Sequence, residues 1–137
     1  MADLSHKIIY ESAGELLAEL ANETGRPMSF AVLNAHRELL HYTRMDGAPY
    51  RSSVLSHNKA YSAVWFGRDS VEIEKMVGDR GIAAYGDANL TSIVGGVLGK
   101  DKNDVVLGAV GASGRTAQED IDVAVRLMDK MKSKAGI

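Results

Sequence analysis

The sequence predicts an α+β domain in which helices flank an antiparallel sheet. The expected order is helix, two strands, two helices, two strands, helix, and short turns join the strands of each pair, which makes them antiparallel. The chain has 137 residues, and no linker or low-complexity segment divides it. Residues 1–137 are therefore expected to form a single domain with its own core.

The first helix and the first strand pair follow from hydrophobic spacing and from turn residues. Apolar side chains recur at helical spacing between residues 8 and 21, and Thr24-Gly25-Arg26-Pro27 ends this helix. Residues 28–34 and 38–45 are expected to be strands. The short turn between them predicts a hairpin.

Two helices are expected next. The first covers residues 52–66, with Ser52 or Ser53 as N-cap. Its small residues indicate close packing against the sheet or against a partner subunit. Asp69 and Glu72 are spaced like a capping box and predict a short helix through Val77. The expected inner stripe of the 52–66 helix is Val54, Asn58, Tyr61 and Trp65, with Ala60, Ala63 and Val64 alongside.

The second half of the chain is richer in glycine. Residues 78–89 are expected to be irregular, and residues 90–97 to form a strand that ends in Gly95-Gly96. The last strand is expected over residues 105–110, followed by a glycine-rich bend from Gly108 to Gly114. Thr116 and Glu119 form a capping box that begins the final helix.

Composition excludes several classes of function. A net charge of -2 lacks the basic excess typical of nucleic-acid binders, and the absence of cysteine removes disulfides and thiolate chemistry. No apolar run has the length of a membrane span, and the N-terminus does not resemble a signal peptide. A cytoplasmic protein without a nucleic-acid or membrane partner is expected.

Three features carry candidate chemistry. Arg44 and Asp46 follow the second strand, where a guanidinium can bind a carboxylate and Asp46 can act as a catalytic group. The alternative is that Asp46 caps the turn and pairs with Arg44 or Lys59. Lys59 is a candidate buried base or Schiff-base former, or else a structural ion pair.

The glycine-rich segment is the third candidate feature. Gly111, Ser113 and Gly114 precede a helix N-terminus, where backbone N–H groups can bind an anion, although a purely conformational role is also open. We expect these residues, Arg44, Asp46 and Lys59 to meet in one pocket for an anionic small molecule. The four histidines show no metal-ligand spacing, so no metal site is predicted.

The ordered motifs resemble the family of GlcG and HbpS proteins and PduO C-terminal domains, often labelled haem-degrading. They are Arg44-Met45-Asp46-Gly47-Ala48, Lys59-Ala60, Gly95-Gly96, the Gly108–Gly114 segment and Asp120. The resemblance implies a profilin-like fold and homo-oligomers. It also implies haem or a corrinoid as a possible cofactor.

Two function classes follow. The first is a small-molecule-binding protein, with haem or a corrinoid as the ligand that the resemblance implies. The second is a cofactor-independent isomerase or lyase that acts on a small carboxylate- or carbonyl-containing metabolite. The residues alone do not decide whether the protein is an enzyme.

We predict a homo-oligomer. The small-residue helix that ends in Trp65 and Phe66 offers more apolar surface than one core needs, and such surfaces pair with partners. Light scattering at micromolar concentration should give a mass above 14.7 kDa. A mass equal to that of one chain would contradict the prediction.

Overall fold

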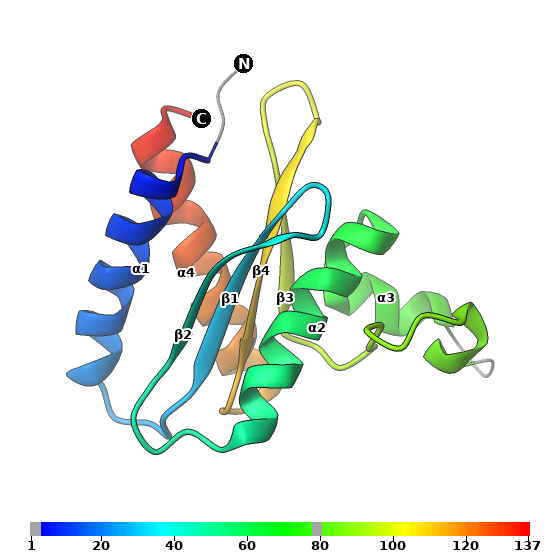
Figure 1. The fold of residues 1–137 in the computed structure, drawn as a ribbon, viewed down its shortest axis with the longest axis horizontal. Helices are drawn as coiled ribbons and strands as arrows, with labels where there is room; N and C mark the ends of the chain where they lie inside the picture. The colour runs from blue at the N-terminus through cyan, green and yellow to red at the C-terminus, as the bar shows by residue number, and fades with distance from the viewer. Residues whose placement is uncertain (1–3, 78–80) are drawn as a thin grey trace.

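The computed structural model describes residues 4–77 and 81–137, which form a four-stranded antiparallel sheet between two layers of helices (Figure 1). The strand order is β2-β1-β4-β3. Helices α1 and α4 cover one face, and α2, with α3 beside it, covers the other. The α+β prediction is confirmed. The elements are α1 His6–Ala21, β1 Ser29–Asn34, β2 Leu39–Arg44, α2 Tyr50–Phe66, α3 Ser70–Val77, the 3-10 helix η2 Ile82–Tyr85, β3 Gly96–Lys100, β4 Val106–Ser113 and α4 Ala117–Ala135.

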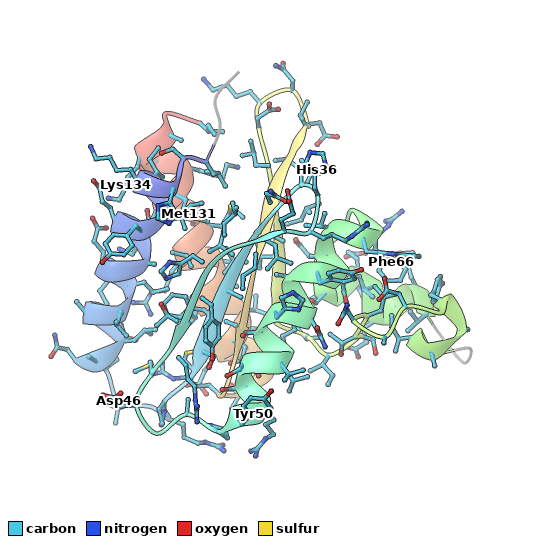
Figure 2. The ribbon with its side chains drawn as sticks, viewed as in Figure 1. His36, Asp46, Tyr50, Phe66, Met131 and Lys134 are labelled. Atoms are coloured by element: carbon cyan, nitrogen blue, oxygen red, sulfur yellow. The ribbon has the colours of Figure 1, made fainter. Side chains whose placement is uncertain are left out.

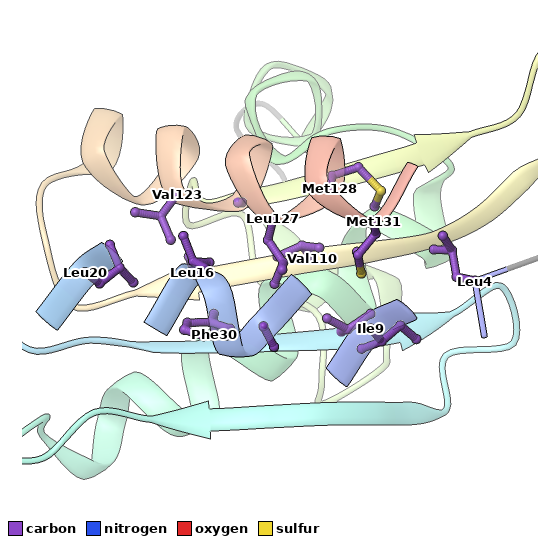
Figure 3. Close-up of a cluster of buried hydrophobic side chains, with 14 of the residues drawn as sticks. Leu4, Ile9, Leu16, Leu20, Phe30, Val110, Val123, Leu127, Met128 and Met131 are labelled. Carbon is purple, nitrogen blue, oxygen red and sulfur yellow. The ribbon is translucent and has the colours of Figure 1, made fainter. Parts of the chain in front are cut away.

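The larger core lies between the sheet and the layer of α1 and α4 (Figure 3). Leu16 of α1 and Leu127 of α4 meet Phe30 of β1 and Val110 of β4, and all four are fully buried. The apolar spacing of both helices places these side chains on one face each. The predicted capping box of Thr116 and Glu119 begins α4 and is confirmed.

On the other face of the sheet, the backbone of α2 lies in direct contact with the strands. A Cβ atom on Gly111 of β4 would overlap the Ser56 carbonyl oxygen of α2, and one on Gly96 would overlap the Lys59 carbonyl oxygen. Helix α2 therefore approaches the sheet as closely as its backbone allows, which only glycine on the strands permits. This close packing carries Lys59 into the interior.

Two expectations for α2 are wrong. Its N-cap is Pro49, while the hydroxyl of Ser52 donates to the Pro49 carbonyl at 2.6 Å. Of the expected inner stripe, Val54 and Trp65 lie outward, 43% and 37% exposed, and Asn58 and Tyr61 are half-buried, whereas Ala60 and Ala63 beside it are fully buried. Close contact with the sheet selects small side chains, so the buried face consists, apart from Lys59, of Ser52, Ser56, Ala60, Ser62 and Ala63.

The expected strand over residues 90–97 is also wrong, because the strand begins at Gly96. Ahead of it the chain is anchored to helices instead: Thr91 N–H donates to the Ser62 hydroxyl at 2.8 Å, and Gly96 N–H to the Ser70 hydroxyl at 2.8 Å. The carboxylate of Asp69 accepts from Leu98 N–H rather than capping α3. Part of the expected irregular stretch 78–89 lies outside the described residues, and the rest includes η2.

The glycine-rich segment 108–114 is strand rather than bend as far as Ser113. Strand β4 pairs with β1 from Ser29↔Ser113 to Asn34↔Gly108. Its glycines serve close contacts, since a Cβ on Gly108 would overlap the Leu33 carbonyl oxygen. Glycine is common in turns, but here the same residue type makes room for neighbouring backbone.

A row of ion pairs joins α1 to α4 on their solvent side. Arg126 donates to Glu19 and Glu23, each at 2.7 Å, and Lys134 donates to Glu15 at 2.7 Å. Hydrogen bonds lower the pKa of all three carboxyls below their ordinary values: from Lys134 for Glu15, from Lys130 and then Arg126 for Glu19, and from Arg126 for Glu23.

We predict that acid weakens the fold through these pairs. Because the folded pKa values are lowered, the stabilisation is complete above the unfolded carboxyl pKa and is lost as pH falls through the folded pKa values. Urea unfolding at a series of pH values should show a steeper fall for the wild type than for Arg126→Gln. Parallel pH profiles would show that these pairs contribute nothing.

A matched pair of glycine substitutions tests the packing of α2. Gly111→Ala should lower the free energy of unfolding by about 1–3 kcal/mol, since the added methyl group meets rigid backbone. Gly14→Ala, in α1 with no atom within 4 Å of the added Cβ, should raise it by about 0.5–1 kcal/mol. Equal effects in urea unfolding would contradict the described contact.

Candidate active site

A cavity of about 730 Å³ lies at one end of the sheet, where β2 and β4 end and α2 and α4 begin. Ser29 of β1 pairs with both Arg44 and Ser113, so the register places these two strand ends at the same end of the sheet. The cavity wall also includes the α1–β1 loop and residues 92–94. Its volume is within the range of small-molecule sites.

Lys59 and Asp120 form a buried ion pair that lines this cavity. The Lys59 Nζ lies 3.2 Å from Asp120 Oδ2 and donates to the Ala112 carbonyl at 2.8 Å. Asp120 Oδ1 accepts from Arg115 N–H at 3.0 Å. An ammonium has three N–H donors, and the third has no acceptor among the described residues. One donor of this buried amine therefore has no partner among the described residues.

Glycine makes room for this amine. A Cβ on Gly95 would lie 2.7 Å from Lys59 Nζ and 2.6 Å from the Ala112 carbonyl oxygen. The backbone conformation of Gly95 is also unusual, with a φ of +139° that other residues rarely adopt. The Gly95-Gly96 pair thus accommodates both the Lys59 side chain and the α2 backbone.

Burial opposes the charged form of both partners. Desolvation lowers the pKa of Lys59 and raises the pKa of Asp120, while the attraction between the two acts in the opposite direction on each. The pKa values of the two groups therefore lie closer together than those of a lysine and an aspartate in water. A proton can therefore pass from the amine to the carboxylate at a lower cost than in water.

Positive charge dominates the rest of the cavity. Arg26, Arg51 and Arg115 line it, and Glu74 is the acidic neighbour besides Asp120. The Arg115 side chain is only 5% exposed; its Nε donates to the Arg26 carbonyl at 2.9 Å, and its Nη2 has no hydrogen-bond partner among the described residues. Four cationic and two acidic residues line the cavity, and Glu23 lies 3.9 Å from Arg115 Nη1, so a smaller positive excess remains, which suits an anion.

The structure brings together some of the predicted site residues. Lys59, Ser113 and Gly114 line the cavity. Arg44, Asp46 and Gly111 are not among the lining residues.

The three residues outside the cavity have structural surroundings. Arg44 donates from Nε and Nη2 to the Ala48 carbonyl, at 2.9 and 2.6 Å, and so closes the loop after β2. Asp46 is exposed on that loop (Figure 2). Gly111 lies beneath α2, where it permits the close contact with Ser56.

Four residues that line the cavity were not predicted as site residues from the sequence. Asp120 appeared only as part of the family motif, although its place just after the capping box of α4 was a usable signal. Arg26, Arg51 and Arg115 come from three separate segments and carry no shared spacing. Their convergence depends on strand order, which no local pattern reveals.

Neither a metal cluster nor a histidine belongs to the cavity as described. Residues 4–77 and 81–137 contain no group of three or more His, Asp or Glu side chains placed to hold a metal ion. His36 lies in the β1–β2 hairpin, far from Asp46 and Tyr50 at the cavity end of the sheet (Figure 2).

No helix within the same described ranges is both long and apolar enough to cross a membrane.

Solved structures share this fold. Klebsiella pneumoniae ORFY superposes with a TM-score of 0.83 at 25% identity, covering 94% of this chain and 90% of that one. A PduOC–haem complex gives 0.74 at 23% identity, covering 90% and 89%. A double mutant of Streptomyces reticuli HbpS gives 0.81 at 22% identity, covering 94% and 87%.

Sequence comparison agrees with the fold. The chain is 36% identical over 114 residues to an uncharacterized 15.0 kDa protein of Citrobacter freundii from the dhaT-dhaS intergenic region, which spans 80% of this chain and 79% of that protein. The family model described as haem degrading protein HbpS-like matches residues 8–129. The chain therefore belongs to the HbpS-like family.

Proposed function

We propose that the cavity binds a small organic anion that carries a carboxylate group. The observation that carries this proposal is the buried Lys59 amine, which lines the cavity and keeps one N–H without a protein acceptor. Leaving a buried donor unpaired costs free energy, and a ligand oxygen would remove that cost. The volume of about 730 Å³ suits a small metabolite.

The arginines explain the choice of anion. Arg26 and Arg51 are exposed and line the cavity, so they can reach a ligand that enters from solvent. A guanidinium matches a carboxylate in two parallel hydrogen bonds. The first turns of α2 and α4 also border the cavity, and helix N-termini favour negative charge.

Haem is the ligand that the relatives suggest, since the family description names haem and one solved neighbour is a haem complex. Haem iron in proteins is held by His, Cys, Met or Tyr. None of these types is among the described residues that line the cavity. The cavity therefore does not fit a haem whose iron is ligated in the usual way, although its arginines suit carboxylates in general.

Calorimetric titration with lactate tests the proposal. Arg51→Ala should weaken binding about 10- to 100-fold, because a charged hydrogen bond to the carboxylate is lost. The melting temperature should be unchanged, because the Arg51 side chain forms no hydrogen bond or ion pair with other described residues. Arg68→Ala is the matched control: Arg68 is exposed and lies outside the cavity.

Equal affinities of wild type, Arg51→Ala and Arg68→Ala would place the anion elsewhere. Haemin titration of the same proteins is the competing arm. One pair of results would overturn the proposal in favour of a haem site outside this cavity. In that case haemin gives a saturable Soret shift that lactate does not reduce, and calorimetry detects no lactate binding.

A further inference from the structure

Anion binding alone does not require the buried Lys59–Asp120 pair. Exposed arginines already supply positive charge, whereas Lys59 is 1% exposed and Asp120 is 4% exposed. Burying such a pair gives little stability compared with apolar residues of similar volume. The useful property of the arrangement is a primary amine next to a carboxyl group inside a ligand-sized cavity.

We propose that Lys59 forms an imine with an oxo acid, a molecule that carries both a carboxylate and a ketone or aldehyde. This inference rests on the proposed function, because the cavity arginines must first bind the carboxylate. The amine then meets the carbonyl carbon, and Asp120, 3.2 Å from Nζ, moves the protons. A bound electrophile beside a positioned amine needs no cofactor.

The step balances without an oxidant or reductant. The Lys59 ammonium gives a proton to the Asp120 carboxylate, and the neutral nitrogen attacks the carbonyl carbon. Asp120 returns this proton to the carbonyl oxygen, which gives a carbinolamine. The carbinolamine nitrogen then releases a proton to Asp120, which passes it to the hydroxyl group. Water leaves, and the products are an iminium on Lys59 and the Asp120 carboxylate, with the total charge unchanged.

The surroundings favour this chemistry. Desolvation lowers the pKa of Lys59 and raises the pKa of Asp120, so the neutral amine and the protonated acid cost less than in water. The Ala112 carbonyl accepts from Nζ at 2.8 Å and fixes its position. The bare Cα of Gly95 makes room for Nζ itself, since a Cβ there would lie 2.7 Å from it.

Reductive trapping of the wild-type protein tests the inference. Pyruvate and levulinate, which place the carbonyl next to the carboxylate or further along the chain, are each incubated with the protein and sodium cyanoborohydride. At least one of them should add its own mass less one oxygen atom. Peptide mapping should locate this addition on Lys59, with the side chains of Lys7 and Lys75, 85% and 71% exposed, as internal controls.

Variants separate a reactive site from a merely buried lysine. Lys59→Arg keeps a positive charge but cannot form an imine, so it should lose the labelling at this position. Arg51→Ala should slow labelling by the oxo acid at least about tenfold while leaving labelling by acetaldehyde, which has no carboxylate, unchanged. Lactate should slow labelling by the oxo acid without being trapped itself.

The outcomes distinguish this inference from the proposed function. Calorimetric binding of lactate and the oxo acids, with Lys59 unlabelled or labelled no faster than Lys7, would overturn the imine and leave the anion site standing. Failure of all these acids to bind would overturn the anion site and the inference together. Labelling of Lys59 that is equal in wild type and Arg51→Ala would overturn the assignment of an oxo acid.

Discussion

The buried contact between Lys59 and Asp120 is the constraint on which the rest of the site depends. It joins α2, which covers one face of the sheet, to α4, which covers the other, around the end of β4. Breaking such a pair leaves an uncompensated buried charge, so both helices are held in their positions. Lys59 in the middle of α2 and Asp120 in the first turn of α4 both line the cavity, so the pair fixes part of its wall.

Local patterns predicted the elements whose structure depends on their own residues. The helix over residues 8–21, the 28–45 hairpin and the capping box at Thr116 were all visible, because spacing and capping act within a few residues. The outward face of α2 was misassigned because the close approach of the sheet reverses the usual rule that large apolar side chains are buried. The glycines of β4 were misassigned for a related reason. They make room for backbone atoms that are distant in the sequence and do not form a turn.

The site was predictable to the extent that single residues carry its chemistry. Lys59, Ser113 and Gly114 stood out as an amine and an anion-binding segment, and they line one cavity. Arg44 was predicted to bind a ligand because its guanidinium lies next to a turn, but this guanidinium donates hydrogen bonds to the Ala48 carbonyl. The arginines that do reach the cavity had no distinguishing pattern, because strand order brings their segments together.

Membership of the HbpS-like family fixes the scaffold more firmly than the ligand. A shared fold does not imply a shared site, and the side chains around a cavity decide what it holds. Here the cavity lining holds more cationic than acidic side chains and lacks the usual iron ligands among the described residues, although one solved neighbour of the same fold is a haem complex.

The sheet has two ends of different character. The β1–β2 and β3–β4 hairpins lie at one end, together with the start of α1 and the end of α4, while the loops that line the cavity lie at the other (Figure 1). An affinity tag, a fluorescent reporter or a fused protein attached near His6 or Ala135 would therefore leave the entrance of the cavity clear. Surface immobilisation through the same end would present the cavity to solvent, an orientation suited to a biosensor.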